Sequence, residues 1–157
     1  MNAYEQLLDN DDVIVVEKHF KSKAKGLCKG NKIGISKTLS TNEKACVSAE
    51  ELGHYYTSVG NILNLNNANN RKQEYRARMW AYNNRIGLLG LIRAYSSGNK
   101  TTYDMAEYLE VSEEFLNECI QAYTHKYGEC TVVDNYLIRF IPNLQIYEYY
   151  FKDNNFR

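Results

Sequence analysis

Three side chains that can bind a metal ion or move a proton lie close together in the stretch AEELGH, residues 49–54: Glu50, Glu51 and His54. In the zinc-binding motif H-E-x-x-H, two histidines four residues apart hold the ion, and the glutamate beside the first histidine acts as a general base. Here Glu50 stands at the position of the first histidine. On a helix, residues 50 and 54 lie one turn apart and Glu51 lies beside them, so all three can approach one divalent ion.

The replacement of a histidine by Glu50 changes the expected metal chemistry. A carboxylate oxygen binds zinc at about the same distance as an imidazole nitrogen, so a glutamate can serve as a ligand. Its charge and hardness move the preference toward manganese or iron without excluding zinc. The alternative is that Glu50 and Glu51 are ordinary solvated helix residues and His54 is half-buried, because acidic pairs on helices are common.

Two helices are expected to position these residues. Ser40 and Glu43 have the S-x-x-E spacing of a capping box, which predicts a helix from there to about Val59, ending at Gly60. The asparagine-rich residues 61–70 favour a loop. A second, long helix is predicted over residues 71–95, since its apolar positions recur at helical spacing. These positions are Tyr75, Met79, Tyr82, Ile86, Leu89 and Ile92.

A small sheet is expected before the first of these helices. Residues 3–8 predict a short helix, and the β-branched residues 13–16 predict a strand. The stretch KGLCKGNKIGIS alternates apolar and polar positions around Gly30-Asn31, which is typical of a hairpin. We therefore expect a small antiparallel sheet in the first part of the chain.

Further helices and a second hairpin are expected toward the C-terminus. Residues 102–109 and 112–127 predict two helices with the spacing of a helix-turn-helix. A recognition helix meets phosphates near its start, and acidic side chains there would be repelled, so plain helix packing is favoured over DNA binding. These acidic residues are Glu113, Glu114 and Glu118. The last part predicts strands that turn at Asp134-Asn135, and the whole pattern predicts the α+β class.

Length and charge limit the protein class. A chain of 157 residues is expected to form a single domain, residues 1–157. Nineteen basic and nineteen acidic residues cancel, so no overall field attracts nucleic acid or a membrane. Because the sequence shows no apolar membrane span and no leader, we expect a cytoplasmic protein that contacts neither nucleic acid nor a membrane directly. The four scattered cysteines, which lack a C-x-x-C pair, are expected to be reduced and structural.

The residues around the motif resemble a known family. ACVSAEELGHYYTSVGNI resembles the active-site helix of the ImmA/IrrE family of metallopeptidases, whose usual form reads approximately L-A-H-E-L-G-H. KGLCKGNKIGIS is similar to the strand pair before that helix, and EYRARMWA is similar to the second helix of the family. The resemblance covers about residues 10–125. It implies a zincin-like motif helix that packs on the sheet and on the long second helix.

The resemblance also implies roles for individual residues. His54 resembles the second histidine ligand, Glu51 the general base, and Glu74 the glutamate ligand of the second helix, while Glu50 replaces the first histidine. These positions imply one divalent metal ion, zinc in the first place, with manganese or iron as alternatives. A surface pair between Glu74 and Arg78, four residues apart on the helix, is the alternative for Glu74.

The function implied by the resemblance is metal-dependent endopeptidase activity on a protein substrate, a DNA-binding repressor of a phage or mobile element. The alternative is a weak or inactive homologue that binds a repressor or another regulatory protein. A strand beside the motif helix can bind substrate as an added strand if its edge is open, which makes Ile33, Gly34 and Ile35 candidate substrate-binding residues. Tyr55 and Tyr56 are candidates to stabilise an oxyanion, with core packing as the alternative.

Overall fold

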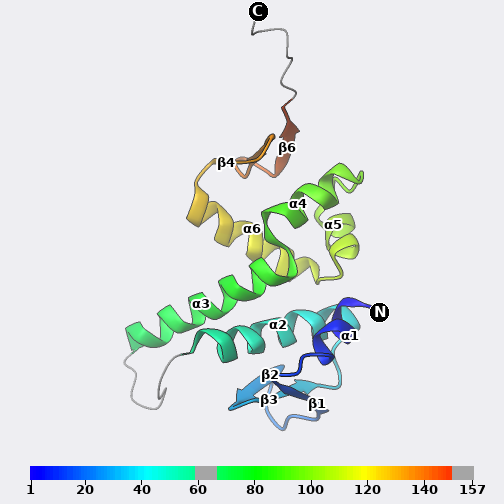
Figure 1. Cartoon of the computed structure of the whole chain (residues 1–157), viewed down its shortest axis with the longest axis vertical. Helices are drawn as coiled ribbons and strands as arrows, with labels where there is room; N and C mark the ends of the chain where they lie inside the picture. The colour runs from blue at the N-terminus through cyan, green and yellow to red at the C-terminus, as the bar shows by residue number, and fades with distance from the viewer. Residues whose placement is uncertain (59–66, 150–157) are drawn as a thin grey trace, which may run out of the picture.

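A computed structural model describes residues 1–58 and 67–149, which form two small sheets with helices between them (Figure 1). This arrangement confirms the predicted α+β class. The elements in chain order are α1 (Ala3–Leu8), β1 (Ile14–Lys18), β2 (Gly26–Lys29), β3 (Lys32–Ser36), α2 (Thr41–Thr57), α3 (Asn67–Arg85), α4 (Gly87–Ser96), α5 (Thr102–Leu109), α6 (Glu113–Tyr127), β4 (Cys130–Val133), β5 (Tyr136–Arg139) and β6 (Gln145–Glu148).

The N-terminal sheet has the strand order β1-β3-β2. The predicted hairpin is confirmed, because β2 and β3 are antiparallel and are joined by Gly30 and Asn31, with a positive φ of 62° at Gly30. The expectation of a wholly antiparallel sheet is wrong, since β1 runs parallel to β3. The connection between β1 and β2 carries the chain past the place that β3 later fills. As a result β3 is the central strand.

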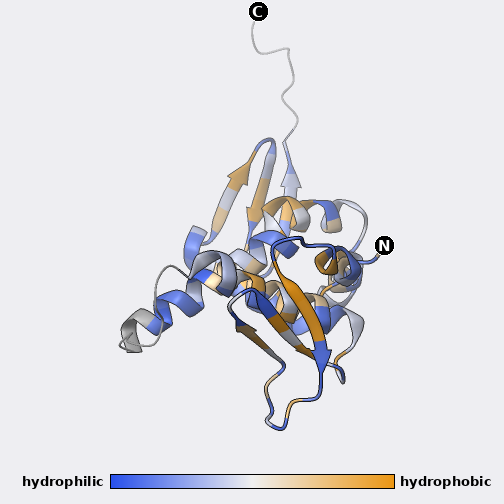
Figure 2. Ribbon diagram, turned by 60° about the horizontal axis from the view of Figure 1, so that its bottom comes forward, coloured by the Kyte–Doolittle hydropathy of each residue, from blue (hydrophilic) through white to orange (hydrophobic). Residues whose placement is uncertain are grey.

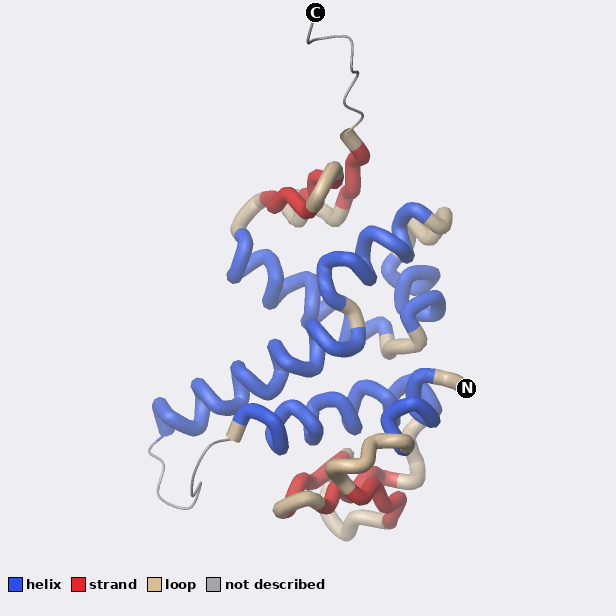
Figure 3. The backbone as a smooth tube through the Cα atoms, in the orientation of Figure 1, coloured by secondary structure: helices blue, strands red, loops and turns tan. Residues whose placement is uncertain are grey.

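The helix that carries the motif begins where the sequence predicts. The Ser40 side chain accepts a hydrogen bond from the backbone N–H of Glu43, which caps α2. The helix ends at Thr57, and Val59 and Gly60, where its end was expected, lie outside the described residues. The segment expected to be a loop is partly helical, because α3 already begins at Asn67. In Figures 1 and 3, α2 and α3 lie side by side between the N-terminal sheet and the remaining helices.

The second helix is shorter than predicted. The expected single helix over residues 71–95 is wrong, because the chain breaks at Ile86 and Gly87 and continues in a new direction as α4 (Figure 3). Gly87 has a φ of 68°, which lies in the left-handed region that glycine adopts at little cost. The following helices α5 and α6 are confirmed, and Ser112 caps α6 through the N–H of Phe115.

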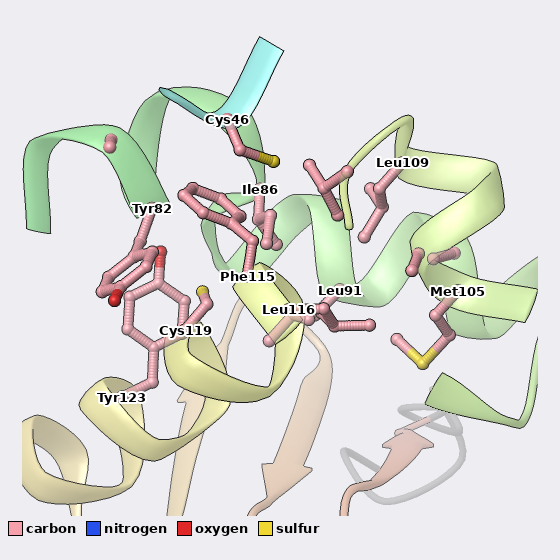
Figure 4. Close-up of a cluster of buried hydrophobic side chains, with 14 of the residues drawn as sticks. Cys46, Tyr82, Ile86, Leu91, Met105, Leu109, Phe115, Leu116, Cys119 and Tyr123 are labelled. Atoms are coloured by element: carbon pink, nitrogen blue, oxygen red, sulfur yellow. The ribbon is translucent and has the colours of Figure 1, made fainter. Parts of the chain in front are cut away.

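Two hydrophobic clusters stabilise the fold. The first joins α3, α4, α5 and α6 to the C-terminal sheet around Leu91, Leu116 and Tyr123 (Figure 4). The second joins α1 and the N-terminal sheet around Ile33 and Ile35. Helix α2 contributes side chains to both clusters. Cys46 and Ala49 face the first cluster, and Ala45, Val47 and Leu52 face the second.

The C-terminal strands extend the predicted hairpin. β4 and β5 are antiparallel and turn at Asp134 and Asn135, as expected, and β6 pairs with the other side of β5 to give three strands. The four cysteines are free, and Cys46 and Cys119 are buried. Among the described helices, none has the length and apolar composition of a membrane span.

Candidate functional site

Helices α2 and α3 approach each other closely at Gly53. A Cβ atom at this position would collide with the backbone carbonyl of Ala77 on α3, so only glycine fits. Ala77 and Ala81 are fully buried in the same contact. Small side chains on both helices let their backbones come close. The contact fixes which residues of α3 face the motif on α2.

The close approach brings together two of the predicted metal ligands. The Nε2 atom of His54 lies 3.4 Å from an Oε1 atom of Glu74. Two ligands of one tetrahedral zinc ion, each about 2.0–2.1 Å from the metal, are separated by about 3.4 Å, so the observed distance fits a shared ion. Within residues 1–58 and 67–149, no ion pair joins Glu74 to Arg78, the alternative partner that the sequence allowed.

Glu51 lies between this pair and the N-terminal sheet. The backbone N–H of Cys28 on β2 donates a hydrogen bond to the Glu51 carboxylate. Burial, and after it the charges of Glu50 and Glu74, raise the pKa of Glu51 to about 7. A general base works best when its pKa lies near the working pH. A pKa of about 7 is suitable for a group that accepts or releases a proton near neutral pH.

Glu50 faces a different pocket. It lines a cavity of about 370 Å³ between α2, α3 and α6, together with Arg78 and Glu118. Burial raises the pKa of the Glu50 carboxyl, the positive charge of Arg78 lowers it, and the negative charge of Glu118 raises it. In the described part of the chain, no three histidine, cysteine, aspartate or glutamate side chains gather closely enough to hold a metal ion. The ligand role of Glu50 stays a prediction.

Two of the three predicted ligands are therefore placed so that they could hold one divalent ion. His54 and Glu74 supply an imidazole and a carboxylate at the right separation, whereas catalytic zinc sites usually have three protein ligands. The third predicted ligand, Glu50, lines the pocket that also contains Arg78.

The groove beside Glu51 has a volume of about 560 Å³ and is bordered by β2. Its lining residues are Leu27, Cys28, Gly30, Glu51, His54, Tyr55, Ser58 and Glu74. The sequence reasoning missed the β2 residues of this lining. Only the alternation around the hairpin pointed to a strand there, and it did not distinguish the edge strand from the central one.

The predicted substrate platform on β3 is wrong, because the condition of an open edge is not met. β3 pairs with β1 on one side and with β2 on the other. Ile33 and Ile35 are 1% and 0% exposed, and Gly34 lies between them on the central strand. The free edge beside the groove belongs to β2.

The two tyrosines after the motif have different surroundings. Tyr55 lines the groove, and its roles in binding substrate and in stabilising an oxyanion stay predictions. The Tyr56 ring stacks on Trp80 with ring centroids 5.2 Å apart, and its hydroxyl donates to Asp12 at 2.8 Å. Tyr56 therefore contacts Trp80 on α3 and Asp12 before β1, and it does not line the groove.

Comparisons with known proteins agree with this geometry. The peptidase family M78, described as the IrrE N-terminal-like domain, matches residues 10–120, well over half of the chain. No curated protein and no solved structure matches the chain. The matched range contains the sheet, both helices of the groove and the residues Glu51, His54 and Glu74. The resemblance stated from the sequence is confirmed: the chain belongs to the IrrE N-terminal-like, or ImmA/IrrE, family of peptidases.

Proposed function

We propose that this protein is a metal-dependent endopeptidase that cuts a protein substrate in the groove between β2 and α2. One observation carries the proposal. Glu51, with a pKa raised to about 7, lies in the same groove as the His54–Glu74 pair, whose atoms are 3.4 Å apart. An acidic group tuned to neutral pH beside two facing metal-binding side chains is typical of a hydrolytic site.

In this proposal the free edge of β2 aligns the substrate. An extended peptide can add to an exposed strand edge through backbone hydrogen bonds, and Leu27 and Cys28 of the edge strand β2 line the groove. The scissile peptide bond would then lie over Glu51. This position replaces the platform on β3 that was expected from the sequence.

Glu51 and its neighbours supply the proton transfer. The Glu51 carboxylate takes a proton from the water that attacks the peptide carbonyl and later gives it to the leaving amine. The Cys28 N–H holds the carboxylate in place for both steps. A divalent ion held by His54 and Glu74, with zinc as the first choice and manganese or iron as alternatives, would supply Lewis-acid polarisation of the carbonyl.

For the substrate we propose a DNA-binding repressor of a phage or mobile element. Family membership supports this choice. The chain would then control gene expression by removing the repressor and would contact neither nucleic acid nor membrane itself.

A second candidate function is a protein that binds the repressor without cutting it. The surroundings of Glu50 favour this candidate, because Glu50 lines the pocket with Arg78 and does not line the groove that contains His54 and Glu74. Without a third ligand the ion would be held weakly, and the groove would serve binding alone.

One experiment separates the two candidates. The full chain, stripped with a chelator, is incubated with the repressor encoded nearest to its gene and with added zinc, manganese or iron(II), and the products are identified by mass spectrometry. Peptidase activity predicts cleavage only with metal, and its loss in Glu51→Gln but not in the exposed control Glu107→Gln. If no metal gives cleavage and calorimetry still detects chelator-insensitive association, the non-cutting candidate is correct.

A further inference from the structure

The outer face of the N-terminal sheet, opposite α2, carries an uncovered row of apolar side chains. Val16 on β1, Gly34 on β3 and Leu27 on β2 are direct neighbours across the three strands. Val16 is 50% exposed and Leu27 is 52% exposed. Figure 2 shows the strands of this sheet as largely hydrophobic ribbons. Large apolar side chains that stay exposed together often mark an interaction site.

Phe20 adds to this row. A Cβ atom at Gly34 would lie 3.3 Å from the Phe20 ring, so the ring rests on the sheet at the one position without a side chain. Phe20 itself is half-buried. The apolar row therefore consists of Val16, Phe20 and Leu27, with Gly34 as its floor.

Lysines flank the row on both sides. The neighbouring row of the same face contains Ile14, Lys32 and Lys29, and Lys18 lies on the other side along β1. These three lysines are exposed. In the described part of the chain no ion pair neutralises any of them.

The basic character extends over the whole segment that builds this face. Residues 18–37 contain seven lysines and no acidic residue: Lys18, Lys21, Lys23, Lys25, Lys29, Lys32 and Lys37. The balancing charge lies elsewhere, since residues 104–118 contain six acidic and no basic residues. That acidic segment covers α5 and the start of α6, on the far side of α2 and α3 from the sheet (Figure 1).

We propose that this outer face, defined by Ile14, Val16, Phe20 and Leu27 with Lys18, Lys29 and Lys32, binds an acidic amphipathic segment of a partner protein. Apolar side chains of the segment would cover the apolar row, and its carboxylates would reach the lysines on either side. The face lies opposite the helix that carries Glu51 and His54, and of its residues Leu27, on the edge strand, also lines the groove. The proposal does not depend on peptidase activity.

The apolar row favours a polypeptide over nucleic acid. Phosphate groups need only the cations, and their binding would leave Ile14, Val16 and Leu27 exposed. The segment 18–37 also contains no arginine, the residue that most often reads base edges. An acidic peptide with apolar side chains uses both features of the face.

The test uses a fluorescein-labelled peptide of alternating leucine and aspartate or glutamate residues, and fluorescence anisotropy as the readout. Removing one apolar contact or one charge is expected to weaken binding about two- to fivefold, so Val16→Ser and Lys32→Gln should each do so. The matched controls are Val132→Ser, an exposed strand valine on β4, and Lys126→Gln, an exposed lysine on α6. Both controls should bind as tightly as the unchanged chain, and so should Glu51→Gln.

Three results would overturn the proposal. The first is equal binding of a peptide in which serine replaces every leucine. The second is tighter binding of a random duplex DNA, unaffected by Val16→Ser, which would identify a phosphate-binding surface. The third is self-association that rises with protein concentration in analytical sedimentation. If Lys32→Gln abolishes this self-association and the peptide does not disturb it, the partner is a second copy of this chain. Circular dichroism of each variant establishes that the fold is unchanged.

Discussion

The substitution Glu51→Gln should stabilise the metal-free protein at alkaline pH. Burial and two neighbouring carboxylates raise the pKa of Glu51 from 4.5 to about 7, so the folded state favours the protonated form. Its contribution to stability is complete below pH 4.5 and is lost as the pH rises through 7. Glutamine stays neutral, can still accept the Cys28 N–H, and has a helix propensity close to that of glutamate.

The magnitude follows from the size of the change in pKa. At 1.36 kcal/mol per pKa unit, the rise to about 7 corresponds to a ceiling of about 3 kcal/mol in the free energy of unfolding. Glu51 keeps part of its surface in water, and solvent screening reduces the expected gain to about 1–2 kcal/mol. The gain should therefore be small at pH 4.5, half complete between about pH 5 and 6, and nearly complete at pH 7 and above.

Urea unfolding followed by circular dichroism, in excess chelator and at several values between pH 4.5 and 8.5, measures this difference. The exposed Glu107→Gln on α5 serves as the control and should follow the unchanged chain. Parallel stability curves for the unchanged chain and Glu51→Gln across this pH range would refute the reasoning. They would mean that the Glu51 carboxylate is solvated and has an ordinary pKa.

Three further predictions concern the packing and the site. Gly53→Ala should lower the free energy of unfolding by about 1–3 kcal/mol in urea titrations because its Cβ collides with Ala77, whereas Gly90→Ala, with room for a methyl group, should be neutral or stabilising. Glu50→His should tighten zinc binding at least tenfold in calorimetry, because an imidazole one helical turn before His54 can rotate out of the Arg78 pocket and supply the third ligand; an unchanged dissociation constant would exclude that position as a ligand. Leu91→Ala should cost about 2–5 kcal/mol, since this side chain is completely buried, and a thermal melt tests it.

The elements predicted correctly depend on signals within a few residues. Ser40 and Ser112 cap α2 and α6 because a hydroxyl placed just before a helix reaches an N–H two or three residues later. The hairpin turn at Gly30 is likewise specified by its own residues. Such features can be predicted from sequence because no distant partner is needed to form them.

The errors concern features that depend on distant parts of the chain. The apolar spacing continues through Ile86, so nothing in the pattern marks the break at Gly87, which serves the packing of α4 against α5 and α6. β3 is the central strand because it pairs in parallel with β1, which comes much earlier in the chain, as well as with its hairpin partner β2. Neither the strand order nor its consequence for the substrate platform can be predicted from a single strand.

The site was predictable in part for the same reason. Helical spacing places Glu51 beside His54, and the position of Glu74 on the second helix matched the family pattern. The pocket that Glu50 lines is completed by Arg78 from the facing helix and by Glu118 from α6, and their charges act on the pKa of Glu50. An argument from one helix cannot include these partners.

Helix α2 supplies side chains to both hydrophobic clusters, and this has a genetic consequence. The helix that carries Glu51 and His54 packs against both clusters, so a cavity opened in either cluster can displace this helix. Substitutions that abolish function should therefore be scattered from the first helix to the last sheet, instead of gathering around the groove. A random mutagenesis map of this protein would outline its interior more clearly than the groove beside Glu51.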